Sequence, residues 1–125
     1  MRILVVDDEE DARVALEIIL ASQGHNVNLA INGIDALNIL EQEQFDLIIT
    51  DILMPEMDGI ELVQKAKQGN HGLKVILISG GGRQLGSAQY DYLSVGQKLT
   101  ATQHVLKKPF PPQDLIKLLE EIIGD

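Results

Sequence analysis

The sequence predicts an α/β fold in which helices cover both faces of a parallel sheet, an arrangement called doubly wound. Short apolar runs rich in β-branched residues alternate with longer stretches whose apolar residues recur at helical spacing, which is the pattern of βαβ units. Three of the short runs are almost continuously apolar, as strands buried on both faces must be. The length of 125 residues suits one core, so residues 1–125 are expected to form a single domain.

Five strands are expected, and their sequences separate central strands from edge strands. The central strands are residues 3–6, 46–50 and 75–78, where Ile, Leu and Val follow one another with few interruptions. Residues 27–30 alternate between polar and apolar side chains, and residues 104–107 are flanked by polar residues. We therefore expect these two weaker strands at the edges of the sheet.

Four helices are well specified by apolar residues at helical spacing, which lie within residues 12–20, 34–40, 60–66 and 115–123. Gly24 is expected to end the first helix in a left-handed conformation. The last helix follows two prolines, which suit a first helical turn. Its apolar stripe is assigned to the core because such stripes more often face a core than a partner.

The segment from Gly80 to Gln103 is harder to assign. Three glycines at 80–82 predict a loop, and a helix over 88–99 would contain Gly96, which costs about 1 kcal/mol relative to alanine. We therefore expect a weakly stable fourth helix behind a long mobile loop, which makes five helices in all.

Composition limits the classes of function. The formal net charge of −9 disfavours direct binding to nucleic acid, which requires clustered Lys and Arg. The absence of cysteine excludes disulfides, a thiolate nucleophile and Cys-based zinc sites. No apolar run approaches the roughly 20 residues that span a bilayer, and the N-terminal run is too short for a signal peptide. A cytoplasmic protein with no membrane contact is expected.

Polar residues follow the strands at the edge of the sheet where ligands bind in parallel α/β folds. They are Asp7, Asp8, Asp51, Ser79 and Lys108. Three carboxylates at neighbouring strand ends would repel one another without a cation, and an all-oxygen cluster favours Mg²⁺. Asp51 lies on the middle run, where a carboxylate free to attack phosphorus would form an acyl phosphate. Ser79 would then donate a hydrogen bond to the phosphoryl group, and Lys108 would neutralise its charge.

Each of these residues also has an ordinary structural interpretation. Asp7 and Asp8 could cap the first helix, and Asp58 is preferred as the cap of the third. Lys107 is the rival of Lys108, but adjacent strand residues face opposite sides, so only one can reach the site. Three dispersed histidines without ligand spacing are interpreted as surface or half-buried side chains: His25, His71 and His104.

Four motifs, in this order along the chain, resemble the receiver domains of two-component response regulators: LVVDDE at 4–9, DILMPEMDG at 51–59, ISG at 78–80 and KPF at 108–110. The resemblance covers essentially the whole chain. It implies a flavodoxin-like, CheY-like fold with strand order 2-1-3-4-5, and a cis bond between Lys108 and Pro109. It also implies six site roles: Asp7 and Asp8 as the metal-binding acidic pair, Asp51 as phosphoacceptor and metal ligand, Leu53 as a metal ligand through its main-chain carbonyl, Ser79 as the switch hydroxyl and Lys108 as the lysine beside the phosphoryl group.

The function that the resemblance implies is that of a Mg²⁺-dependent phosphoacceptor rather than an enzyme, apart from its own phosphorylation and dephosphorylation. The expected partners are a histidine kinase or histidine phosphotransfer protein as donor and a separate output protein. The chain is expected to be a monomer or weak dimer. A phosphorelay intermediate and a pseudo-receiver that only binds partners are the alternatives.

Two other classes fit less well. An aspartate-nucleophile phosphatase would carry an acid-base aspartate at the position of Leu53. A flavodoxin-like module would meet repulsion between the flavin phosphate and Asp7 and Asp8.

The sequence departs from the usual receiver pattern near Ser79. Val105, three residues before Lys108, stands where many receivers have an aromatic switch residue, and the segment from Gly80 to His104 is longer than usual. Without a ring that changes position, movement of Ser79 must be relayed by backbone, which glycine makes adaptable. We therefore expect the segment from Gly80 to Leu99, within the surface formed by the fourth and fifth strands and the helix between them, to be the switch.

Overall fold

A computed structural model describes residues 1–79 and 96–124 and confirms the expected parallel sheet. Its strands pair in the order β2-β1-β3-β4-β5, which is the order that the resemblance implies. The strands are β1 (Arg2–Val6), β2 (Asn26–Ala30), β3 (Leu47–Asp51), β4 (Lys74–Ser79) and β5 (Val105–Lys107). The two strands expected at the edges, β2 and β5, lie there.

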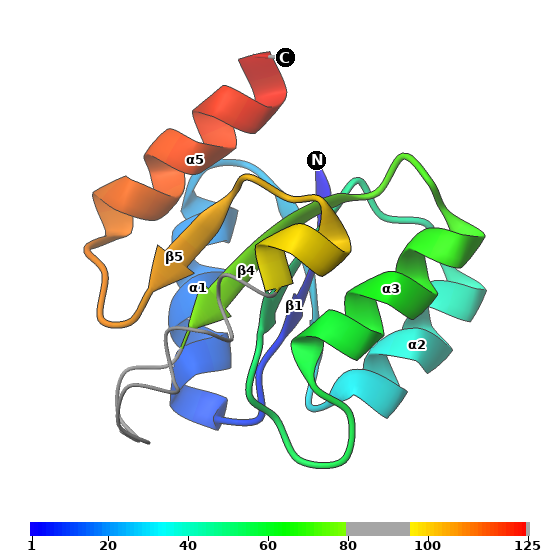
Figure 1. The fold of residues 1–125 in the computed structure, drawn as a ribbon. Coiled ribbons are helices and arrows are strands. Elements are labelled where there is room, and N and C mark those ends of the chain that lie inside the picture. The colour runs from blue at the N-terminus through cyan, green and yellow to red at the C-terminus, as the bar shows by residue number, and fades with distance from the viewer. Residues whose placement is uncertain (80–95, 125) are drawn as a thin grey trace.

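Helices cover both faces of the sheet (Figure 1). They are α1 (Glu10–Ser22), α2 (Gly33–Gln42), α3 (Gly59–Gly69) and α5 (Pro112–Gly124). In Figure 1, α1 and α5 lie on one side of the sheet, whereas α2 and α3 lie on the other. Among the helices of the described residues, none is both long enough and apolar enough to cross a membrane.

The fourth helix can be compared with its prediction only in part. Residues 80–95, which include the predicted loop and the start of that helix, lie outside the described residues. Residues 96–100, the first described residues after that gap, are helical. A Cβ atom at Gly96 would lie 3.0 Å from the side chain of Leu77 and 3.3 Å from that of Ile60, so this turn packs closely on β4 and α3.

Two apolar clusters form the core, one on each face of the sheet. The first packs β-strand residues against α2 and α3, with Ala36 and Leu62 among its buried members. The second packs the other face against α1 and α5, with Leu16 and Leu115 among its buried members. The stripe of α5 therefore lies in the core, as predicted, with Leu119 only 2% exposed.

The helix ends confirm two predictions and correct a third. Gly24 has φ of +86°, as expected of a left-handed residue after α1. Asp58 caps α3 by accepting a hydrogen bond from the amide of Glu61 at 2.8 Å. The alternative that Asp7 or Asp8 caps α1 is wrong, because the N-cap position is Glu9, which makes no side-chain capping bond.

The register of the strands brings their carboxyl ends to one edge of the sheet. Val6 pairs with Thr50, Asp51 pairs with Ile78, and Ser79 pairs with Lys107. Asp7, Asp51 and Lys108 therefore meet at the same edge, although 101 positions separate Asp7 from Lys108.

Candidate functional site

Three carboxylates converge at this edge of the sheet. Asp7 and Asp8 lie in the connection between β1 and α1, and Asp51 ends β3. Each of the three offers a carboxylate oxygen, and these oxygens all lie within 4.8 Å of one another. Asp7 and Asp51 are buried, at 0% and 5% exposure, whereas Asp8 is half-buried. The structure therefore assembles the acidic cluster from the residues that the sequence singled out.

Lys108 joins two of these carboxylates. Its Nζ atom donates a hydrogen bond of 2.8 Å to Oδ2 of Asp7 and one of 3.3 Å to Oδ2 of Asp51. Lys107, by contrast, is exposed. The side chain that reaches the cluster is therefore Lys108, which also precedes a cis peptide bond to Pro109, as the resemblance implied.

Burial and the neighbouring charges together set the pKa values of Asp51 and Lys108. Burial raises the pKa of Asp51, and the nearby charge of Asp7 raises it further, while the charge of Lys108 opposes both effects. Burial alone would lower the pKa of Lys108, but the hydrogen bond to Asp7 and the charges of Asp51 and Asp7 outweigh it and raise that pKa. Lys108 is therefore held as a cation, and the ionised form of Asp51 is less favoured than that of an exposed aspartate.

Asp7 is held in place by several contacts. Its Oδ1 atom accepts a hydrogen bond from the amide of Glu9 at 2.9 Å, while its main-chain carbonyl accepts one from Nη1 of Arg13 at 2.7 Å. The sequence analysis missed Arg13. Side chains of a helix tilt toward its N-terminus, so a long cation in the first turn of α1 can reach back to the end of β1.

Gly59, at the start of α3, closes the motif at 51–59, but the sequence analysis gave it no role. Its amide donates a hydrogen bond of 2.8 Å to the carbonyl of Ile52. A Cβ atom at this position would lie 2.2 Å from the main-chain oxygen of Asp51, which is closer than any real contact. Only glycine lets α3 approach the end of β3 this closely, so Gly59 fixes the backbone that carries Asp51.

Leu53 and Ser79 lie beside the cluster. The amide of Leu53 donates a hydrogen bond of 3.3 Å to Oδ1 of Asp51. The carbonyl of Ser79 accepts a hydrogen bond of 2.8 Å from the amide of Lys108. The roles of the Leu53 carbonyl as a metal ligand and of the Ser79 hydroxyl as a switch stay predictions.

The donor set suits a hard divalent cation. All three groups of the cluster are carboxylates, which Mg²⁺ prefers as ligands, and they lie close enough to share one ion. Three carboxylates against the single ammonium of Lys108 leave a formal excess of two negative charges. A divalent cation would neutralise that excess.

The strands of this chain pair in the order β2-β1-β3-β4-β5, and acidic residues and a lysine lie at the carboxyl edge of the sheet. These two features together are typical of the class of receiver domains. A model of the response regulator receiver domain family matches residues 3–120. The chain therefore belongs to this family of two-component signalling domains.

Individual relatives agree with this membership. Response regulator receiver protein CpdR of Brucella abortus is 35% identical over 122 residues, which cover 98% of this chain and 96% of that protein. Sporulation initiation phosphotransferase F of Bacillus subtilis is 32% identical, covering 87% of this chain and 82% of that protein. Other relatives are longer, since the chain spans 56% of the probable transcriptional regulator ycf29 of Porphyra purpurea.

Solved structures show the same fold. Chemotaxis protein CheY4 of Vibrio cholerae superposes with a TM-score of 0.82 at 26% identity, covering 97% of each chain. A CheY-like receiver domain protein of Methanospirillum hungatei superposes with a TM-score of 0.83 at 31% identity, covering 98% of this chain and 94% of that one.

Proposed function

We propose that this receiver domain accepts a phosphoryl group on Asp51 in a reaction that requires Mg²⁺. The donor would be a phosphohistidine of a histidine kinase or of a histidine phosphotransfer protein. A carboxylate oxygen of Asp51 would form the new bond to phosphorus as the bond from phosphorus to the donor nitrogen breaks, and that nitrogen would keep the electron pair. The product is an acyl phosphate on Asp51.

The contact of Lys108 with Asp51 carries this proposal. At 3.3 Å, the ammonium lies where it can neutralise charge on a phosphoryl oxygen attached to Asp51. Asp7 holds the same ammonium at 2.8 Å, so Lys108 would be oriented before the donor arrives. Asp7, Asp8, Asp51 and the carbonyl of Leu53 would hold Mg²⁺, which, when bound, supplies positive charge to the transferred phosphoryl group.

The position of Leu53 disfavours hydrolysis of external phosphate esters. An aspartate-nucleophile phosphatase needs an acid-base group beside its nucleophile, whereas Leu53 contributes only main-chain groups and an apolar side chain that packs on the core. Incubation with a phosphomonoester and Mg²⁺ should therefore give no sustained release of phosphate. Repeated turnover would contradict the proposal.

The Mg²⁺ requirement can be tested with acetyl phosphate as donor. The purified domain should gain one phosphoryl group per chain with Mg²⁺ present and none with EDTA, as measured by intact mass. Asp8→Ala should lose most of this labelling. It should also lose most of the rise in melting temperature that Mg²⁺ causes in the unaltered chain, because it removes the most accessible carboxylate of the cluster.

Asp11→Ala is the matched control, since Asp11 is an exposed acidic residue of α1 that is not part of the cluster. It should behave as the unaltered chain does. An Asp8→Ala variant that labels fully and responds fully to Mg²⁺ would rule out its metal role.

The output would be a changed surface around β4, residues 96–100 and β5. Val105 pairs with Leu77 in register and is half-buried, while Leu77 also contacts the position of Gly96. A shift of Ser79 at the end of β4 would therefore pass to residues 96–100 by packing rather than by an aromatic ring. A separate output protein would read this surface. The name of the Bacillus subtilis relative favours, as the alternative, passing the phosphoryl group onward.

Hydrogen exchange tests this output. With Mg²⁺ and fluoroberyllate bound as a phosphoryl mimic, the amides between Gly80 and Leu99 should exchange more slowly than in the free protein. If protection changes only around Asp7, Asp8 and Asp51, the switch lies elsewhere.

A further inference from the structure

The three carboxylates of the acidic cluster differ in what holds them. Each side-chain oxygen of Asp7 and of Asp51 accepts a hydrogen bond, either from Lys108 or from a main-chain amide. Within the part of the chain that the structure describes, the carboxylate of Asp8 accepts none and forms no salt bridge. The direction of the Asp8 side chain is therefore set by the main chain on either side of it.

Both peptide groups that flank Asp8 are held by neighbouring side chains. The preceding peptide ends in the carbonyl of Asp7, which accepts a hydrogen bond of 2.7 Å from Nη1 of Arg13. The following peptide contains the amide of Glu9, which donates to Oδ1 of Asp7 at 2.9 Å. Because each peptide group is planar, one bond to each restrains the two main-chain rotations at Asp8. Arg13 therefore controls one of the two planes that aim this carboxylate.

The bond from Arg13 replaces a main-chain partner at a buried position. Asp7 is 0% exposed, and no other hydrogen bond to its carbonyl is found among the described residues. A buried carbonyl without a donor is unfavourable, so loss of the guanidinium would favour rotation of this peptide toward water. The same rotation would turn Asp8 away from the other two carboxylates.

Helix stability does not explain a cation at this position. Arg13 is the fourth residue of α1, whose first turn otherwise carries the acidic residues Glu10 and Asp11. The N-terminal end of a helix favours negative charge and disfavours positive charge. The contact with the carbonyl of Asp7 is what this arginine contributes here.

We propose that Arg13 is a positioning residue for Mg²⁺, which it would not itself touch. It holds the peptide between Asp7 and Asp8 in the orientation that brings the carboxylate oxygen of Asp8 within 4.8 Å of those of Asp7 and Asp51. This inference rests on the proposed function of the acidic cluster as the Mg²⁺ site. Ligands that are oriented before the ion arrives bind it more tightly, and the residues that orient them affect affinity strongly.

The charge of Arg13 would have the opposite effect from its hydrogen bond. A cation beside the cluster repels Mg²⁺, so loss of the charge alone would tighten Mg²⁺ binding. Loss of the bond would weaken binding, because Asp8 would no longer be directed toward the ion. The direction of the change in affinity therefore separates the two effects.

Titration of the folded domain with MgCl₂, followed by the amide chemical shifts of residues 6–9, tests this role. Arg13→Met should bind Mg²⁺ at least about fivefold more weakly than the unaltered chain. Arg13→Lys restores the charge and an N–H donor, and it should bind at least about twofold more tightly than Arg13→Met. With acetyl phosphate as donor, the Mg²⁺ concentration for half-maximal labelling should rise in Arg13→Met, while the rate at saturating Mg²⁺ stays within about twofold.

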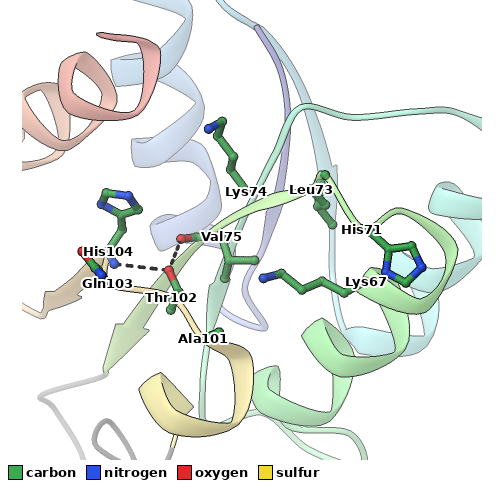
Figure 2. Close-up of a pocket in the computed structure, with 10 residues that line it drawn as sticks. Lys67, His71, Leu73, Lys74, Val75, Ala101, Thr102, Gln103 and His104 are labelled. Carbon is green, nitrogen blue, oxygen red and sulfur yellow. Dashed lines mark hydrogen bonds between the residues drawn. The ribbon is translucent and has the colours of Figure 1, made fainter. Parts of the chain in front are cut away.

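Two matched controls each remove one positive charge and one bond to a main-chain carbonyl. Nη1 of Arg2 donates to the carbonyl of Gln44 at 2.9 Å, and Nζ of Lys67 donates to that of Thr100 at 3.0 Å. Arg2 begins β1, and Figure 2 shows Lys67 near Val75 at the start of β4, so both lie away from the carboxyl edge of the sheet. Arg2→Met and Lys67→Met should change the Mg²⁺ affinity by less than about twofold.

A double-mutant cycle tests whether Arg13 acts through Asp8. In the Asp8→Ala background, Arg13→Met should change the remaining Mg²⁺ affinity by less than about twofold, because the carboxylate that it positions is gone. An equal loss with and without Asp8, or unchanged or tighter binding by Arg13→Met, would overturn this inference while leaving the Mg²⁺ site in place. Absence of Mg²⁺ binding by the unaltered chain would overturn the proposed function and this inference together.

Discussion

Asp51→Asn should accept no phosphoryl group from acetyl phosphate or from a phosphohistidine donor, even with Mg²⁺ in excess. An amide oxygen is too weak a nucleophile to form the bond to phosphorus. The variant should nevertheless fold, because asparagine has nearly the same shape and Lys108 keeps its 2.8 Å bond to Asp7.

The same substitution should raise the melting temperature measured without Mg²⁺. Burial and the charge of Asp7 raise the pKa of Asp51, which means that the folded state disfavours its ionised form. A neutral side chain removes that cost. Asp114→Asn is the matched control, since Asp114 is an exposed residue in the first turn of α5, and it should be labelled like the unaltered chain. Full labelling of Asp51→Asn would overturn the assignment of the phosphoacceptor.

Gly59→Ala should lower the free energy of unfolding by about 3 kcal/mol, because overpacking here involves backbone that cannot move aside. The added Cβ atom would lie 2.2 Å from the main-chain oxygen of Asp51 and 3.1 Å from Cα of Ile52. Relief requires α3 to move away, which would stretch the 2.8 Å bond between the amide of Gly59 and the carbonyl of Ile52. Urea unfolding would measure the loss.

Gly69→Ala in the same helix is the control for this prediction. A Cβ atom at Gly69 would meet no heavy atom within 4 Å, and alanine suits a helix better than glycine by about 0.5 to 1 kcal/mol. The stability of this variant should be unchanged or slightly higher. Equal losses in the two variants would mean that the close approach of Gly59 to Asp51 is not what makes glycine necessary there.

Periodicity was enough to predict the five strands and the helices α1, α2, α3 and α5. The apolar runs at 3–6, 46–50 and 75–78 correspond to β1, β3 and β4, because strands covered on both faces leave few polar positions. The order of the strands could not be predicted from periodicity, since apolar runs do not determine which strands pair. That order came from the resemblance to receiver domains and is confirmed by the pairing.

The site was predictable to the extent that it follows strand ends. Asp7, Asp51 and Lys108 follow or end strands whose register aligns them, so their meeting could be expected from the sequence. The contacts of Arg13 and Gly59 could not be expected from the sequence. They depend on how closely α1 and α3 approach the ends of β1 and β3. Arg13 lies in none of the four motifs, and the motif that ends at Gly59 does not show what that residue contacts.

Chemical mapping of the phosphorylated residue tests the central claim most directly. Borohydride reduces an acyl phosphate of aspartate to homoserine, which tandem mass spectrometry locates in the sequence. After labelling with acetyl phosphate and Mg²⁺, we expect homoserine at position 51 and at no other position. Modification of another residue, or no modification although Mg²⁺ is bound, would contradict the account of Asp51 as the phosphoacceptor.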